Sequence, residues 1–384
     1  MSLLTQLLIL GCLVLVTASV VVSLELVLRK WAKEFRISGR QETATFTRHA
    51  HAGEGSWTLP WELAAQRDTS FSKQHWMEMQ RWAQMKPKVG RVPLQPDDPR
   101  SVLSLVGFDF SGAEFSVRNG ERTTTDQPSS PKSEILCYGG STTFCMEVSD
   151  SSTWCSALQR KVNEYAPGHF KVRNLGIPGA PGLDRIATFR YQSFLNAKDV
   201  AVFLFGDNDA GWTQWFPRSG TVHENFPRPL ARTLAKLEYE FGRGIEIAGW
   251  LRREVSLPIL KRYARKTSRE TIVAAEEAVS WAETRRADVL FVLQPNLLTL
   301  RSRDAWDARI LSSTAKDLLV MLESAYASYR DWSSHSHSVV IATDLFDLES
   351  PSPYMGDWAH VNTRGNQLIA DFVFDELKAR GVLG

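Results

Sequence analysis

Three stretches of this 384-residue chain place polar side chains that could carry out acyl transfer at predicted turns. Ser141 follows two glycines after a short apolar run, and its hydroxyl could act as a nucleophile if a base removed its proton. Asn208 follows a second apolar run, where its side-chain amide could donate a hydrogen bond to a developing oxyanion. Asp357 and His360 are three residues apart, so the carboxylate could orient the imidazole and support its protonated form. Each stretch taken alone is also typical of an ordinary turn.

The elements that would position these residues alternate between short apolar strands and helices. Strands are expected at 135–138, 170–175, 200–205, 289–293 and 339–342, and helices at 152–165, 184–195, 313–330 and 363–380. Such alternation is typical of a parallel sheet that helices cover on both faces. Ligands of these sheets bind at the carboxyl ends of the strands, and Ser141 and Asn208 each follow such an end.

Two other kinds of site fit these turns less well. A phosphate-binding loop needs a lysine at a fixed spacing from its glycines, and none lies near Ser141. Asp207 and Asp209 flank Asn208, but calcium loops require more oxygen ligands and a different spacing. The sequence therefore predicts neither a metal ion nor an organic cofactor.

Composition narrows the class of protein further. The chain is 43% hydrophobic and 23% charged, with a formal net charge of +2, so a nucleic-acid partner is not expected. Four cysteines are too few for a disulfide scaffold. Cys145 and Cys155 could pair in an oxidising compartment, or they could remain free as small hydrophobic residues.

The N-terminus predicts a membrane anchor. The first 24 residues carry no charged side chain, and about 20 apolar residues are enough to span a bilayer. A cleavable signal peptide would need a basic start and a shorter apolar stretch. We therefore expect a single-pass transmembrane anchor at 1–28. The basic residues that follow favour a cytoplasmic domain, although long domains can be translocated despite such charges.

The rest of the chain divides into two parts. Residues 29–130 are irregular and are interpreted as a juxtamembrane extension, whereas 131–384 hold the regular alternation of strands and helices. A helical insertion at about 210–286 interrupts this alternation. Its basic amphipathic helices could cap the active site, lie on the bilayer surface, or simply face solvent.

Taken in order, these stretches resemble the SGNH hydrolases, also called the GDSL-type esterase superfamily. The resemblance runs from about residue 131 to the end, without the insertion, and its four blocks are "GGSTTFCMEVSDSSTW", "NLGIPG", "GDND" and "DWAH". Asn362 and Gly365 follow the last block, as in many members. The chain departs from the family in two places. Gly140 replaces the aspartate of Gly-Asp-Ser, and Cys145 stands where many members have a glycine.

The resemblance implies a fold and a set of roles. The fold would be a three-layer α/β/α sandwich with a five-stranded, mostly parallel, flavodoxin-like sheet. Ser141 would be the nucleophile, His360 its base and Asp357 the residue that orients the base. The oxyanion hole would consist of the backbone N–H groups of Ser141 and Gly179 and the side-chain amide of Asn208.

The expected function is hydrolysis of an O-acyl ester, with an acetyl or other short acyl group, in a small molecule or a glycan. Two alternatives stay open at this point. A membrane-tethered O-acetyltransferase acting on envelope polysaccharide could use the same triad, and a non-catalytic binding protein could keep the fold. Many relatives with one N-terminal anchor are exported, which favours an extracytoplasmic domain.

Overall fold

The computed structural model describes residues 61–85, 89–93, 101–105, 109–192, 195–210, 257–314 and 316–384. The expected anchor at 1–28 and residues 211–256 of the expected insertion lie outside these ranges. Within the described residues, no helix combines the length and the apolar character needed to cross a membrane.

A mostly parallel eight-stranded sheet forms the centre of the fold, in the order β10-β9-β8-β6-β7-β5-β4-β3. Its five parallel strands correspond to the five predicted ones: β6 (Ser133–Gly139), β7 (Phe170–Gly176), β8 (Val200–Phe205), β9 (Asp288–Leu293) and β10 (Val339–Ile341). The antiparallel strands β3 (Phe110–Ser111), β4 (Ser116–Arg118) and β5 (Glu121–Arg122) extend it beyond β7.

The prediction of a five-stranded sheet is therefore wrong in the number of strands. The three additional strands have two or three residues each and lie before residue 131, in the segment interpreted as an extension and not as part of the sheet. They cover the edge of β7, where Arg122 of β5 pairs with Asn174. Covering an exposed edge in this way prevents pairing with other chains.

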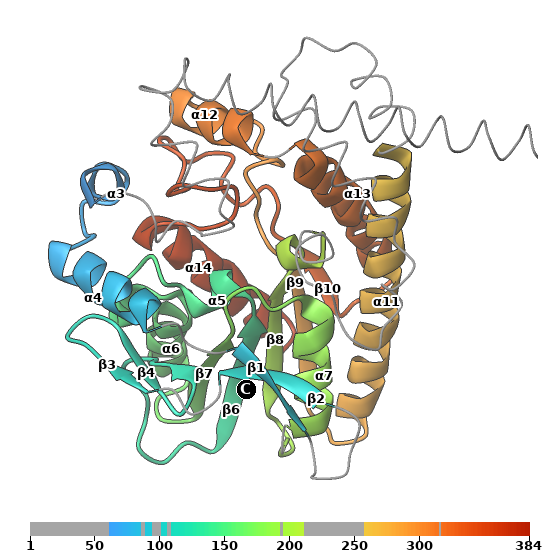
Figure 1. Cartoon of the computed structure of the whole chain (residues 1–384). Helices are drawn as coiled ribbons and strands as arrows, with labels where there is room; N and C mark the ends of the chain where they lie inside the picture. The colour runs from blue at the N-terminus through green and yellow to red at the C-terminus, as the bar shows by residue number, and fades with distance from the viewer. Residues whose placement is uncertain are drawn as a thin grey trace, which may run out of the picture. The chain divides into compact units, whose positions relative to one another are not determined.

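Helices lie on both faces of the sheet (Figure 1). One face carries α7 (Gly182–Gln192), α11 (Leu257–Glu283) and α13 (Lys316–Ser333), and the other carries α6 (Trp154–Tyr165) and α14 (Thr363–Ala379). The remaining elements are α3 (Trp61–Arg67), α4 (Lys73–Gln84), α5 (Ser141–Phe144), η2 (Asp150–Ser152), α12 (Ala305–Ser313) and a separate hairpin of β1 (Val89–Pro93) and β2 (Ser101–Leu105). This arrangement confirms the α/β class.

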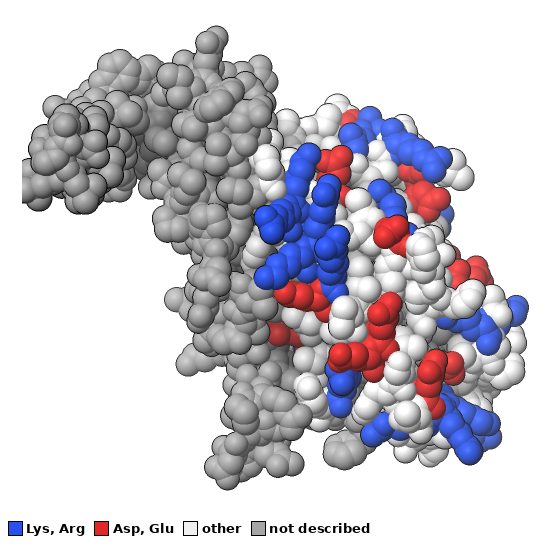
Figure 2. Space-filling view, turned by 90° about the vertical axis from the view of Figure 1, so that its right-hand side faces the viewer, with Lys and Arg blue, Asp and Glu red and all other residues white. Residues whose placement is uncertain are grey.

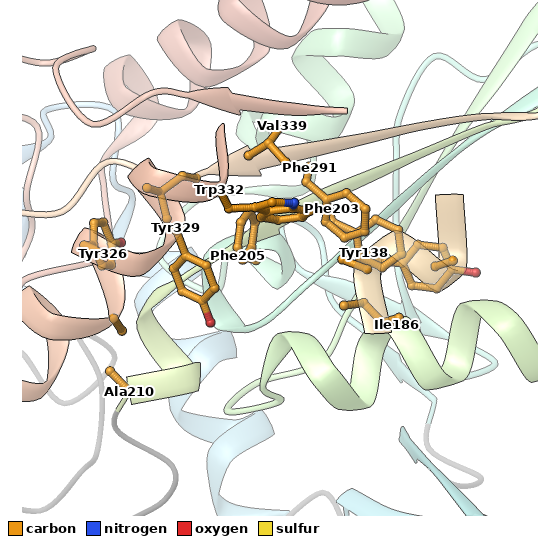
Figure 3. Packing of buried hydrophobic residues seen from close by; sticks show 14 of the residues in the cluster. Tyr138, Ile186, Phe203, Phe205, Ala210, Phe291, Tyr326, Tyr329, Trp332 and Val339 are labelled. Carbon is orange, nitrogen blue, oxygen red and sulfur yellow. The ribbon is translucent and has the colours of Figure 1, made fainter. Parts of the chain in front are cut away.

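An aromatic ladder runs across the central strands and fixes their register (Figure 3). Tyr138 stacks on Phe203 with ring centroids 5.0 Å apart, and Phe203 stacks on Phe291 at 4.6 Å. The three residues are direct neighbours on β6, β8 and β9, and all are almost fully buried. Cross-strand pairs of this kind stabilise a sheet, and here they align the carboxyl ends of the three strands.

A second core cluster connects the segment before residue 131 to this sheet. Trp82 and Phe115 pack against Phe144 of α5, and the same cluster includes Phe71 and Ala180. The early part of the chain thus forms one wall around the short helix that Ser141 begins.

The last part of the expected insertion, 257–283, forms the single helix α11. Its inner side contributes to the main core through residues such as Leu260 and Ala275. Figure 2 looks onto this side of the molecule and shows Lys and Arg side chains gathered there. On α11 the exposed cations are Lys261, Arg262, Arg265, Lys266 and Arg269.

Candidate active site

Ser141 lies where β6 gives way to a short helix. The strand ends at Gly139, Gly140 is the N-cap residue of α5, and Ser141 is its first residue. Gly140 has an ordinary φ of −87°, so its backbone does not require glycine. A side chain is instead opposed by a lack of space, because a Cβ at this position would lie 2.1 Å from Nδ2 of Asn208. The side chain of Asn208 therefore occupies the space that a side chain at position 140 would need, and it would have to move to admit one.

The proposed oxyanion donors surround this turn. Asn208 directs its amide at Gly140 and donates a hydrogen bond to the carbonyl of Ala180 at 3.0 Å. The neighbouring Gly179 has φ of +74°, in the left-handed region that favours glycine. Among the described residues, no acceptor takes the backbone N–H of Ser141 or Gly179. Both N–H groups therefore remain available to a ligand.

Asp357 holds the imidazole of His360 in one orientation. One carboxylate oxygen accepts from Nδ1 of His360 at 2.6 Å, while the other accepts from the backbone N–H groups of Ala359 and His360 at 2.9 and 2.8 Å. Hydrogen bonds from Met355 to the His360 carbonyl and from Asn362 to Pro353 close the loop around them. Nε2 is left as the nitrogen that faces away from Asp357.

Carboxylates determine the charge of His360. Burial by itself lowers the pKa of His360, but the negative charges of Asp357, Glu147 and Asp207 outweigh it and raise that pKa to about 10. Burial likewise raises the pKa of Asp357, but His360 and its hydrogen bonds more than reverse this, so the net shift is downward. At neutral pH the pair is a carboxylate and an imidazolium.

Two small cavities open on either side of the α5 N-terminus, and Leu204 and Gln294 line both. One has Thr142 and His360 in its wall, and the other has Gly140 and Asn208. Ser141 lies between Gly140 and Thr142 in the sequence, and each of these two neighbours lines one of the cavities. Its hydroxyl has no hydrogen-bond partner among the described residues, His360 included.

A buried network of polar side chains, which the sequence did not predict, is hydrogen-bonded to Thr142 in the turn that carries Ser141. Thr142 donates to Oε1 of Gln294 at 2.9 Å, and Nε2 of Gln294 donates to Asp207. Asp207 also accepts from Asn296 at 2.5 Å and from Tyr326 at 2.7 Å. Gln294 directly follows β9, so the strand-end rule applied to Asn208 would have found it. Tyr326 belongs to α13, and no signal in the sequence marks it.

Burial raises the pKa of Asp207 to about 7, against the opposing effect of the hydrogen bonds from Tyr326 and Asn296 and of the charge on His360. Since both oxygens of Asp207 already accept hydrogen bonds, this carboxyl serves the network. Asp209 accepts at Oδ1 from the backbone N–H of Gly182 at 2.9 Å and from the hydroxyl of Thr271 at 3.3 Å.

The second family departure, Cys145, also has a structural explanation. Its φ of 55° is left-handed, the conformation that a glycine adopts readily. The thiol donates to the carbonyl of Thr142 and to Asn366, both at 3.1 Å, and burial raises its pKa far above the usual value. A protonated thiol is a poor nucleophile. Cys137, Cys145 and Cys155 are all free and buried, so the alternative of a Cys145–Cys155 disulfide is not realised.

Comparison with known proteins finds similarity only among solved structures. No protein-family model matches the chain, and no curated protein does either. LAE5, an alpha/beta hydrolase from the metagenome of Lake Arreo in Spain, is 17% identical, with a TM-score of 0.37 over 66% of this chain and 98% of its own.

Two further structures are similar to the same extent. A GDSL-like lipase candidate from Parabacteroides merdae is 18% identical, with a TM-score of 0.36 over 66% of this chain and 97% of its own. The acetyl xylan esterase AlAXEase is 12% identical, with a TM-score of 0.36 over 63% and 98%. The three neighbours are thus an alpha/beta hydrolase, a GDSL-like lipase candidate and an acetyl xylan esterase. At such low scores and identities, the likeness says nothing by itself about the chemistry of this site.

Proposed function

We propose that the chain is a serine esterase of the SGNH type that cleaves an O-acyl ester. The observation that carries the proposal is the pairing of Asp357 with Nδ1 of His360, in a cavity whose wall includes the residue after Ser141. A carboxylate that holds Nδ1 makes Nε2 the nitrogen that can act as the base once its proton has left. The site needs no metal ion or cofactor for this reaction.

Catalysis would begin when neutral His360 accepts the hydroxyl proton of Ser141 at Nε2. The serine oxygen bonds to the ester carbonyl carbon, and the carbonyl oxygen becomes an oxyanion. The N–H groups of Ser141 and Gly179 and the amide of Asn208 would donate to it. The imidazolium then returns its proton to the leaving alkoxide. Water, activated in turn by the imidazole, cleaves the acyl-serine bond and releases the carboxylic acid.

The walls of the cavity support a short acyl group. Phe346, Val361 and Ile369 line the cavity beside His360, and Cys145 adds a protonated thiol. Two carboxylates, Asp357 and Glu147, lie beside the imidazole, so a negative charge on the acyl part would be repelled. These features favour an acetyl or similar neutral acyl group, carried by a small molecule or by a glycan.

The uncharged N-terminal stretch supports a single-pass anchor at 1–28 that tethers this domain to a membrane. The resemblance to exported enzymes supports a domain outside the cytoplasm. Protease treatment of intact cells would digest the domain in that orientation. Protection of the domain until the cells are lysed would reverse the assignment.

The test of the proposed function is turnover of a small acetyl ester by the full chain in detergent. Ser141→Ala should reduce turnover to the background rate while its circular dichroism spectrum and melting temperature remain those of the wild type. Ser151→Ala, which changes an exposed serine before α6, is the matched control and should retain full activity. Undiminished turnover in Ser141→Ala would remove Ser141 from the reaction.

A further inference from the structure

A second carboxylate faces the catalytic nitrogen of His360. Oε1 of Glu147 lies 3.7 Å from Nε2, and the side chains are only 11% exposed for His360 and 5% for Glu147. Asp357 already occupies Nδ1 at 2.6 Å. Both imidazole nitrogens therefore face carboxylates, and the one at Nε2 occupies the side on which the proposed mechanism requires a serine hydroxyl.

The segment that carries Glu147 is firmly held on both sides. The guanidinium of Arg122, which is fully buried, donates to the carbonyls of Phe144 at 3.3 Å and Val148 at 2.8 Å. It also pairs with Asp150 just beyond the segment. Because these contacts anchor the backbone before and after it, the backbone of Glu147 has little freedom to move away from the imidazole.

We propose that Glu147 is a positioning residue whose charge beside Nε2 stabilises the His360 imidazolium and so restricts the ester cleavage to alkaline pH. This inference rests on the proposed function, because it concerns when His360 can act as a base. In the resting site, the Nε2 proton must leave to solvent before Ser141 can transfer its own proton. A buried carboxylate at 3.7 Å stabilises the charged imidazolium and therefore keeps the neutral base scarce.

The charged groups around His360 have different roles in this arrangement. Asp357 comes from the same loop and acts on Nδ1, whereas Asp207 follows β8 and is engaged by Tyr326 and Asn296. The thiol of Cys145, in the same cavity, is protonated. The buried cation Arg122 on β5 gives its hydrogen bonds to backbone carbonyls and to Asp150. Among the residues that the structure describes, Glu147 is thus the one whose carboxylate lies beside Nε2, the nitrogen that must receive the serine proton.

The experiment compares Glu147→Gln with wild type in two measurements on the full chain in detergent. The first is the pH titration of the His360 imidazole by NMR with isotope-labelled histidine, assigned with a His360→Gln variant. The second is the pH profile of kcat/KM for an acetyl ester. Removal of the carboxylate charge should move both midpoints to lower pH by about one unit or more.

Two further variants make the result specific. Glu147→Asp keeps the charge but shortens the side chain, so its midpoint should fall between those of wild type and Glu147→Gln. It also provides a reading if the glutamine variant does not fold. Glu349→Gln removes a carboxylate that pairs with the exposed Arg364, and it should leave the titration unchanged.

A His360 midpoint that is the same in wild type, Glu147→Gln and Glu147→Asp would overturn the proposal. The NMR titration needs no turnover, so the two proposals can fail separately. A shifted midpoint in a chain without any esterase activity would refute the proposed function while leaving the coupling of Glu147 to His360 in place.

Discussion

Replacing Gly140 with alanine should disable the site without unfolding the protein. The added Cβ would lie 2.1 Å from Nδ2 of Asn208 and 3.3 Å from the carbonyl of Ala180. The amide is the end of a flexible side chain, so it can rotate away. Its hydrogen bond to Ala180 would then be lost, at a stability cost of about 1 kcal/mol.

The effect on activity should be larger than the effect on stability. If Asn208 donates to the oxyanion, displacing its amide costs about 3 kcal/mol of transition-state stabilisation, or 10²- to 10³-fold in kcat. Asn208→Ala should lose a similar factor, because it removes the same donor. KM should change little in either variant, since the oxyanion forms only in the transition state.

The double variant Gly140→Ala/Asn208→Ala tests this reasoning. The new methyl would occupy the space that the amide has left, so the double variant should be no less active than Asn208→Ala alone. The assay is hydrolysis of an acetyl ester by the full chain, with thermal melting as the control for folding. Losses that multiply in the double variant, or full activity in Asn208→Ala, would refute the assignment of Asn208 as a donor.

Three other results are expected. With a pKa of about 10, His360 is neutral in about one molecule in a thousand at pH 7. The value of kcat/KM should therefore rise about tenfold per pH unit towards pH 10. A kcat/KM that already reaches a plateau at neutral pH would contradict this expectation. Asp357→Asn should lower kcat by about 10⁴-fold, because an NH₂ group facing Nδ1 favours the wrong imidazole tautomer. It should also shift the rising limb of the pH profile to lower pH, because the negative charge that stabilises the imidazolium is lost. A pH–rate measurement that finds neither change would argue against the triad. Arg122→Met should lower the free energy of unfolding, measured in urea, by about 3–5 kcal/mol, because it leaves Asp150 without its buried partner. The control Arg160→Met removes an exposed ion pair and should change the free energy of unfolding by less than about 0.5 kcal/mol. Equal losses in the two variants would show that burial of the Arg122 pair has no importance for stability.

The strands that position the site could be predicted because they are buried on both faces. β8, for example, is buried at every residue, so it appears in the sequence as an uninterrupted apolar run. The rule that ligands bind at strand ends then indicated Ser141 and Asn208. The close approach of Asn208 to Gly140 supports that step, since it brings the ends of β6 and β8 together.

The parts that could not be predicted depend on contacts between residues far apart in the sequence. Glu147 follows a short helix of four residues, and only the folding of the chain brings it to His360. The partners of Asp207, which follows β8, come from the segment after β9 and from α13 in the same way. Strands of two or three residues, such as β5, also leave no periodic pattern from which they could be identified.

The central claim is that the hydroxyl of Ser141 is activated by His360. Treatment of the full chain with a fluorophosphonate probe at pH 9, followed by peptide mass spectrometry, tests this most directly. The account predicts one phosphonylated residue, Ser141, with labelling that is abolished in Ser141→Ala and strongly slowed in His360→Gln. Absence of label on Ser141, or labelling that is equally fast without the imidazole, would contradict it.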